Sequence, residues 1–135
     1  MTLTRSLLVY VITLPIFFAI DLVWLSVVAK NFYRQQIGHL LSADVGWGAA
    51  ILFYLVFIAG IVFFAVKPAL ESHSAGRALA YGAFLGFLTY ATYDLTNQAT
   101  MRDWPVIVTV VDLAWGTVLS ASVAYLSYQV STRLS

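Results

Sequence analysis

The chain has 135 residues, of which 61% are hydrophobic and only 10% are charged, a composition typical of an all-α membrane protein and outside the range of soluble globular domains. A net charge of +1, with seven scattered basic residues, offers no basic surface, so nucleic acid is not expected as a partner. The absence of cysteine excludes disulfides, thiolate metal sites and iron–sulfur clusters.

Four apolar windows follow one another along the chain and predict membrane-spanning helices. A bilayer core about 30 Å thick needs roughly 20 helical residues. The windows that meet this length are residues 6–29, 48–67, 77–98 and 105–128. Pro15 lies inside the first window and predicts a kink, whereas Pro105 opens the fourth, where proline is tolerated. We expect one transmembrane domain over residues 1–135, a four-transmembrane-helix bundle.

The connection between the first two windows mixes apolar and polar residues. Within residues 31–46, Phe32, Tyr33, Ile37 and Leu40 recur among charged and amide side chains. This amphipathic pattern predicts a short interfacial helix that lies along the membrane surface.

The basic residues indicate an orientation. With four spans, both termini lie on the same side of the membrane. That side holds Arg5, Lys67, Arg77 and Arg133, and the opposite side holds Lys30, Arg34 and Arg102. Because cytoplasmic loops carry the excess of Lys and Arg, we expect the termini in the cytoplasm.

Three aspartates lie within the apolar windows. Asp21, Asp94 and Asp112 are expected at one membrane level, because the first and third windows run in one direction and the fourth in the other. A charge at mid-bilayer costs about 2.5–3.5 kcal/mol, so intramembrane acids indicate a functional site. The alternative is a structural one, in which the acids hydrogen-bond to their neighbours and fix the helix register. If the three carboxyl groups converge, they cannot all stay ionised without a compensating cation.

One face of the third window carries small and polar residues together. At 100° per residue, about a third of the helix circumference holds Gly82, Gly86, Tyr90, Tyr93, Asp94 and Asn97. Gly82 and Gly86, with Gly116 in the fourth window, are expected to let helix backbones approach closely. The same face is therefore predicted to serve both helix packing and the site.

A short motif occurs in both the first and the fourth window. Asp21 and Trp24, like Asp112 and Trp115, lie three residues apart and share a helix face. Each indole is thus placed to shield a carboxylate or to donate its N–H within the cluster. The predicted ligand-binding residues are Asp21, Trp24, Tyr90, Tyr93, Asp94, Asn97, Asp112 and Trp115.

Two further aromatic residues are expected outside this site. Tyr54, in the second window, is expected to pack within the membrane. Trp104 flanks the fourth window and is expected to join an interfacial aromatic belt.

Three segments together resemble a known family. They are "DLVWL" from residue 21, "YATYDLTNQATMRDWP" from residue 90 and "VDLAWG" from residue 111. The chain is similar over essentially its whole length to the small bacterial membrane proteins catalogued as domain of unknown function 2177. The resemblance implies a four-helix, multi-pass protein of the bacterial inner membrane and no established activity. Its pattern carries over to Asp21, Trp24, Tyr90, Tyr93, Asp94, Asn97, Trp104, Pro105, Asp112, Trp115 and Gly116.

Three functions are compatible with these residues. In the first, the acids and the aromatic side chains bind or conduct a small cation or an amphiphilic ligand, and transport would call for a homodimer. In the second, the Gly82 and Gly86 face docks on a larger membrane complex as an accessory subunit or sensor. In the third, the acids modify a membrane lipid.

The motif content favours binding over catalysis. The sequence contains no catalytic motif, so catalytic and metal-binding residues stay unknown and an enzyme is disfavoured. The windows hold no histidine for haem and no mid-helix lysine for a retinal Schiff base, so neither cofactor is expected.

Overall fold

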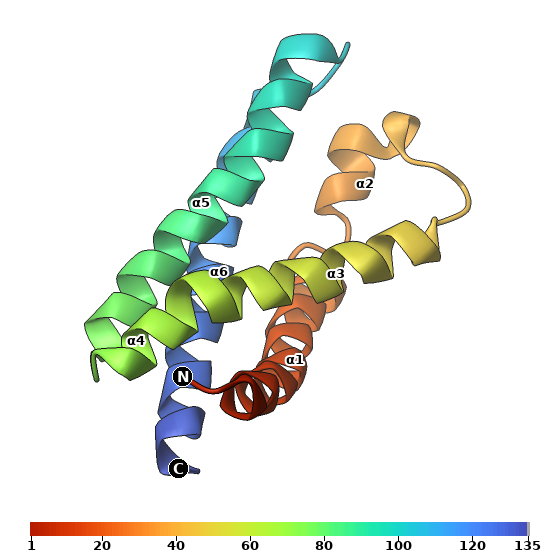
Figure 1. Ribbon diagram of the computed structural model, residues 1–135. Helices are drawn as coiled ribbons and strands as arrows, with labels where there is room; N and C mark the ends of the chain where they lie inside the picture. The colour runs from red at the N-terminus through yellow and green to blue at the C-terminus, as the bar shows by residue number, and fades with distance from the viewer. Residues whose placement is uncertain (135) are drawn as a thin grey trace.

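The computed structural model describes residues 1–134, which form helices and connecting turns without a β-strand (Figure 1). Helix α1 (Leu3–Val23) continues into a π-helical turn, η1 (Trp24–Val28). A short helix, α2 (Phe32–Ile37), and a 3₁₀ turn, η2 (Gly38–Leu40), follow. The remaining elements are α3 (Trp47–Ile61), the π-helical turn η3 (Val62–Val66), α4 (Lys67–Glu71), α5 (Ala75–Thr100) and α6 (Val106–Arg133).

Local sequence signals explain where the long helices begin. The Thr2 hydroxyl accepts a hydrogen bond from the Arg5 amide at 3.1 Å and caps α1, and Ser74 caps α5 in the same way through the Arg77 amide at 3.2 Å. Pro105 directly precedes α6, where its missing N–H costs no helical hydrogen bond.

Three helical stretches of the described residues are long and apolar enough to cross a membrane. They are Leu3–Val28, Trp47–Glu71 and Val106–Arg133. They correspond to the first, second and fourth predicted windows. The third window, 77–98, lies within α5, which is 26 residues long but less apolar because of the small and polar residues in its sequence.

Helices α5 and α6 form the most extensive helix contact of the molecule (Figure 1). A Cβ atom on Gly82 would lie 2.6 Å from the Ser120 carbonyl oxygen, and one on Gly86 would overlap the Gly116 carbonyl oxygen. Only glycine permits backbones to approach this closely. The glycine face of α5 is thus occupied by α6 of the same chain.

The other two long helices cross this pair. In Figure 1, α3 crosses the α5–α6 pair at a large angle, and α1 is viewed nearly along its axis. Helices α5 and α6 therefore run alongside each other, whereas α1 and α3 cross this pair. Their crossing buries an apolar core that includes Phe17, Ile58, Ile61, Leu119 and Val123.

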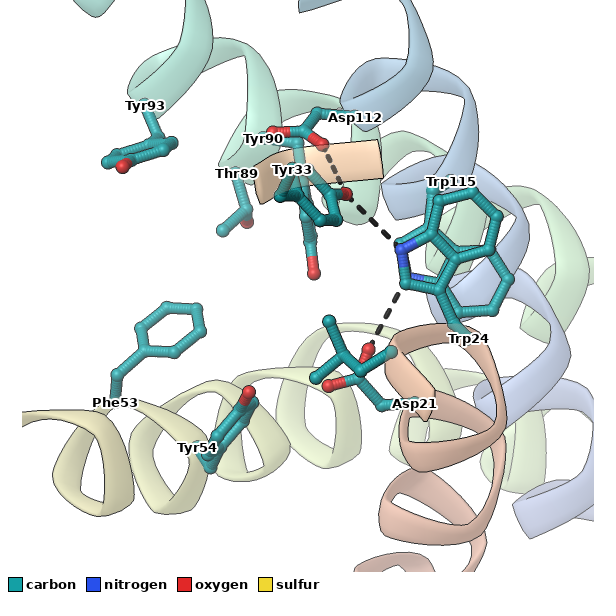
Figure 2. Close-up of a pocket in the computed structure, with 11 residues that line it drawn as sticks. Asp21, Trp24, Tyr33, Phe53, Tyr54, Thr89, Tyr90, Tyr93, Asp112 and Trp115 are labelled. Atoms are coloured by element: carbon teal, nitrogen blue, oxygen red, sulfur yellow. Dashed lines mark hydrogen bonds between the residues drawn. The ribbon is translucent and has the colours of Figure 1, made fainter. Parts of the chain in front are cut away.

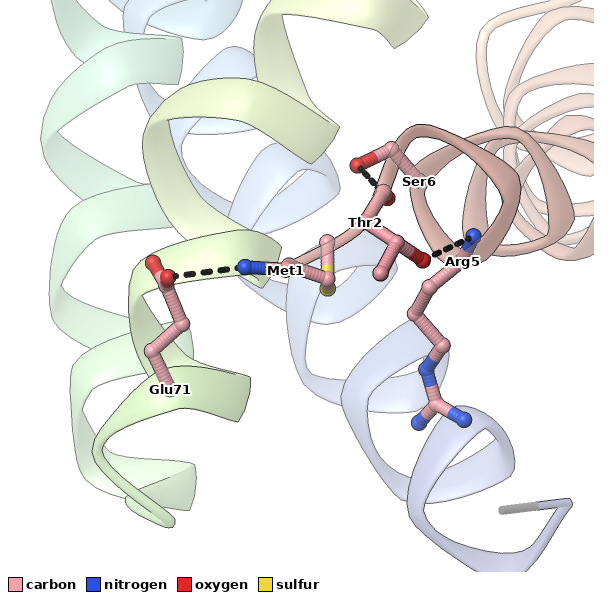
Figure 3. Close-up of polar contacts among 5 residues, drawn as sticks. All are labelled: Met1, Thr2, Arg5, Ser6 and Glu71. Carbon is pink, nitrogen blue, oxygen red and sulfur yellow. Dashed lines mark hydrogen bonds and ion pairs between the residues drawn. The ribbon is translucent and has the colours of Figure 1, made fainter.

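At the far end of this core, the start of α1 is tied to α4 and α6. The Met1 amine lies 3.4 Å from the Glu71 carboxylate (Figure 3), and the Arg5 guanidinium donates a hydrogen bond to the Ser131 carbonyl oxygen at 3.0 Å. Glu71 is half exposed, so the ion pair adds little to stability.

The short helix α2 is present as expected, and it packs against the end of the α5–α6 pair. Ile37 forms a small buried cluster with Trp104 and Val108. Trp104, which was expected in an interfacial aromatic belt, is only 6% exposed and donates its indole N–H to the Thr109 hydroxyl at 3.1 Å, so its side chain packs inside the protein. Its burial reflects the contact with α2, which the sequence alone does not reveal.

Candidate functional site

A cavity of about 400 Å³ lies between α2 and all four long helices (Figure 2). Two carboxyl groups and seven aromatic side chains face it, and no lysine, arginine or histidine of the described residues lines it. The lining residues are Asp21, Trp24, Leu25, Tyr33, Phe53, Tyr54, Thr89, Tyr90, Tyr93, Asp112 and Trp115.

Two stacked indoles form one wall of the cavity. The rings of Trp24 and Trp115 lie 4.4 Å apart between centroids and are inclined by only 8°. Trp24 lies in the π-helical turn η1, and such turns occur frequently at functional sites. The stack joins the end of α1 to α6, the two helices that carry the repeated Asp–Trp motif.

Each indole donates its N–H toward the aspartate of the other helix (Figure 2). The Trp115 indole donates to Asp21 at 3.4 Å. The Trp24 indole donates to the Tyr33 hydroxyl at 3.2 Å, and that hydroxyl donates to the Asp112 carboxylate at 2.6 Å. The two copies of the motif are thus cross-linked, with Tyr33 of α2 inserted on one side.

The Tyr33 hydroxyl is expected to make the stability of the fold depend on pH in the alkaline range. Burial, together with the hydrogen bond to Asp112, raises the pKa of the Tyr33 phenol above its ordinary value. The stabilisation by the neutral phenol is then complete below about pH 10 and is lost as the pH rises through the folded-state pKa. We expect Tyr33→Phe to cost about 1.5–3 kcal/mol at neutral pH and to flatten this alkaline loss. Thermal unfolding of both proteins across alkaline pH measures the difference, and parallel curves for the two proteins contradict it.

Asp94 lies next to Asp112 and outside the cavity. Its side chain is 0% exposed, and neither carboxyl oxygen has a hydrogen-bond donor among the described residues. The Asp112 carboxyl group lies within hydrogen-bonding reach of it. Two carboxyl groups in this position form a hydrogen bond only when they share a proton.

Asp21 does not join this pair. In Figure 2, the Tyr33 and Tyr90 side chains lie between Asp21 and Asp112, and the Tyr54 hydroxyl is close to Asp21. Among the described residues, the three acids do not form one cluster that could hold a metal ion, although Asp21 and Asp112 line the same cavity. Helix direction predicts the height of each carboxyl group in a membrane, but it does not predict which side chains lie between Asp21 and Asp112.

Tyr90 and Tyr93 of α5 face the cavity, and Asn97 does not line it. The Tyr90 ring lies directly against Gly116, where a Cβ atom would overlap it. Tyr93 is 57% exposed at the rim. Asn97 is half-buried one turn beyond Tyr93, past the end of the cavity.

Comparison with known proteins decides the family. The family described as "Predicted membrane protein (DUF2177)" matches residues 6–129. The chain belongs to this DUF2177 family. Searches of curated proteins and of solved structures found no match for it.

Several residues of this DUF2177 cavity were not predicted. Tyr54 packs against Phe17 and Phe18, as a packing residue would, but it also lines the cavity, which was not expected. Phe53 and Tyr33 also lie in segments from which no site residue was expected. Tyr33 occurs in the amphipathic pattern of residues 31–46, but nothing in that pattern shows that its hydroxyl reaches Asp112.

The donor set of the DUF2177 cavity suits an organic cation better than a divalent metal ion. Divalent ions such as Ca²⁺ and Mg²⁺ bind to several converging oxygen ligands. Within residues 1–134, no three acidic, histidine or cysteine side chains come together in a way that could hold a metal ion. Carboxylates set among aromatic faces, by contrast, are the usual environment for an alkylated ammonium group.

Proposed function

We propose that this membrane protein binds an amphiphilic organic cation in the cavity described above. The observation that carries the proposal is the lining, in which Asp21 and Asp112 supply negative charge among seven aromatic side chains, with no basic side chain among the described residues. The ammonium group of the ligand would lie near the carboxylates and against the ring faces, where both attract it.

The rim of the cavity favours a ligand that arrives from the lipid. Phe53 and Tyr93 line the cavity and are 46% and 57% exposed, on helices whose outer surfaces are largely apolar. In a membrane, such a rim faces acyl chains. An amphiphile could therefore place its cationic group inside and leave its apolar part against the rim.

The proposal includes a fourth span, α5. Helix α5 packs along α6, which is itself long and apolar enough to span, and its 26 residues rise about 39 Å at 1.5 Å each. Many of its outward side chains are apolar and exposed, among them Leu79, Phe84, Phe87, Leu88 and Leu95. Of the residues that lower its hydropathy, Gly82 and Gly86 face α6, and the exposed Thr92 and Thr96 hydroxyls donate hydrogen bonds to carbonyl oxygens of α5 itself. With four spans, the protein would lie in a bacterial inner membrane with both termini in the cytoplasm.

A docking function for the glycine face receives no support from the structure. Gly82 and Gly86 contact α6 of the same chain, so a partner could reach them only by displacing that helix. The cavity is the better candidate because it is open to a ligand without rearrangement of the helices.

Two ligands of the same shape and different charge test the proposal. Benzyltrimethylammonium carries a positively charged nitrogen at the position where neopentylbenzene has a neutral carbon. We expect the cation to change the fluorescence of Trp24 and Trp115 on titration into purified protein in lipid nanodiscs, and the neutral analogue to bind at least about tenfold more weakly.

The acids provide the matched variants for this titration. Asp21→Asn and Asp112→Asn are each expected to weaken cation binding at least about tenfold, because each removes a carboxylate from the wall. Asp44→Asn removes an exposed acid that does not line the cavity and is expected to bind like the wild type. Equal affinity for both ligands, or equal weakening by all three variants, would falsify the proposal.

A further inference from the structure

Asp94 is a completely buried acid that does not line the cavity, and the proposed function leaves it unexplained. Its oxygens lack any hydrogen-bond donor among the described residues, and its neighbour within reach is the carboxyl group of Asp112. A buried carboxylate without a donor or a counter-charge is strongly unfavourable. A proton on Asp94 removes this cost, because the resulting O–H can donate to Asp112.

The surroundings decide which of the two acids holds the proton. Asp112 accepts a hydrogen bond from the Tyr33 hydroxyl at 2.6 Å, which favours its ionised form. Asp94 accepts no hydrogen bond, which favours its neutral form. Asp112 is thus suited to be the carboxylate and Asp94 the acid of one carboxyl–carboxylate pair.

The other titratable groups near Asp94 and Asp112 do not remove the proton from these two carboxyl groups. Tyr33 of α2 and Tyr90 of α5 are neutral phenols at physiological pH. Asp21 of α1 and Tyr54 of α3 lie on the far side of the Tyr90 hydroxyl. Among the described residues, no basic side chain lines this cavity, so no resident cation pairs with Asp112 from the cavity side.

We propose that Asp94 and Asp112 share one proton and that a cation bound in the cavity displaces it, so that the protein exchanges a proton for a cation. This inference rests on the proposed function. In this exchange, the cation pairs with the Asp112 carboxylate from the cavity side. The Asp94 O–H bond then breaks, its electron pair stays on the Asp94 oxygen, and the proton leaves to water. The positive charge of the ligand favours this loss because it lies next to the pair.

The exchange has a thermodynamic signature. Displacement of one proton makes cation affinity rise with pH, by up to about tenfold per pH unit over the range in which the pair titrates. Asp94→Asn removes the proton but keeps the hydrogen bond, since the amide N–H can donate to Asp112. We therefore expect this variant to fold and to bind benzyltrimethylammonium, with an affinity that is flat across the same pH range.

Proton release and infrared spectroscopy together test the exchange. In weakly buffered solution with a pH indicator, benzyltrimethylammonium is expected to release up to one proton per site from the wild type and none from Asp94→Asn. The infrared C=O band of a protonated carboxylic acid is expected in the wild type, to fall when the cation binds, and to be missing from the variant. The wild-type spectrum alone tests the shared proton even if the variant does not fold.

Three outcomes overturn the inference and are distinguishable. Equal proton release from wild type and Asp94→Asn places the proton elsewhere. Cation binding to the wild type without proton release or a change in the infrared band refutes the exchange and leaves the proposed function intact. Failure of the wild type to bind the cation, with the infrared band present, refutes the proposed function and the exchange with it, and leaves only a structural shared proton.

Discussion

Gly86→Ala is expected to destabilise the protein by about 3 kcal/mol, because the added methyl group has no space between α5 and α6. It would overlap the carbonyl oxygen of Gly116 and lie 2.5 Å from the Ser120 hydroxyl oxygen. A backbone carbonyl cannot move aside as a flexible side chain can, so the two helices must separate. The gain in helix propensity, about 1 kcal/mol, does not offset this cost.

The control for this prediction is Gly60→Ala in α3. An added Cβ atom there meets nothing within 4 Å, so only the gain in helix propensity remains. Thermal unfolding in detergent, followed by circular dichroism, is expected to show a large loss for Gly86→Ala and none for Gly60→Ala. If the two variants unfold at the same temperature, the close approach of α5 and α6 is incorrect.

Gly116→Ala is expected to abolish binding in the cavity at a smaller cost in stability. Here the added methyl group overlaps the ring of Tyr90, which is a side chain and can swing away. The ring already faces the cavity, so its displacement fills the space in which the cation is proposed to bind. The measurement is the benzyltrimethylammonium titration beside thermal unfolding of the same preparation.

A second substitution separates this effect from general damage. In the double variant Gly116→Ala/Tyr90→Leu, the displaced ring is absent, so binding is expected to recover relative to Gly116→Ala alone. The coupling between the two positions is read from a double-mutant cycle. Additive losses would contradict the steric explanation, since they would mean that Gly116 and Tyr90 act independently.

The helices were predictable because their signals are local. A run of apolar residues long enough to cross a bilayer identifies α1, α3 and α6, and Ser74 and Pro105 mark where α5 and α6 begin. The Asp–Trp motif also identified four lining residues, because a spacing of three residues places both side chains on one helix face.

The rest of the site depends on contacts between distant segments. Tyr33 and Tyr54 reach the cavity from α2 and α3, and no periodicity within those segments fixes which helix they meet. The stack of Trp24 on Trp115 likewise joins two residues that are 91 positions apart in the chain. Sequence spacing predicts the height of a side chain in a membrane but not which side of a neighbouring ring it occupies.

The stacked indoles also give the protein a built-in optical reporter. Two aromatic chromophores 4.4 Å apart and nearly parallel are close enough for their electronic transitions to couple. Their near-ultraviolet circular dichroism and their emission spectrum then depend on the distance between the end of α1 and α6. Any movement that opens the cavity between these helices would be visible in the unlabelled protein, and Trp24→Phe would identify the part of the signal that comes from the stack.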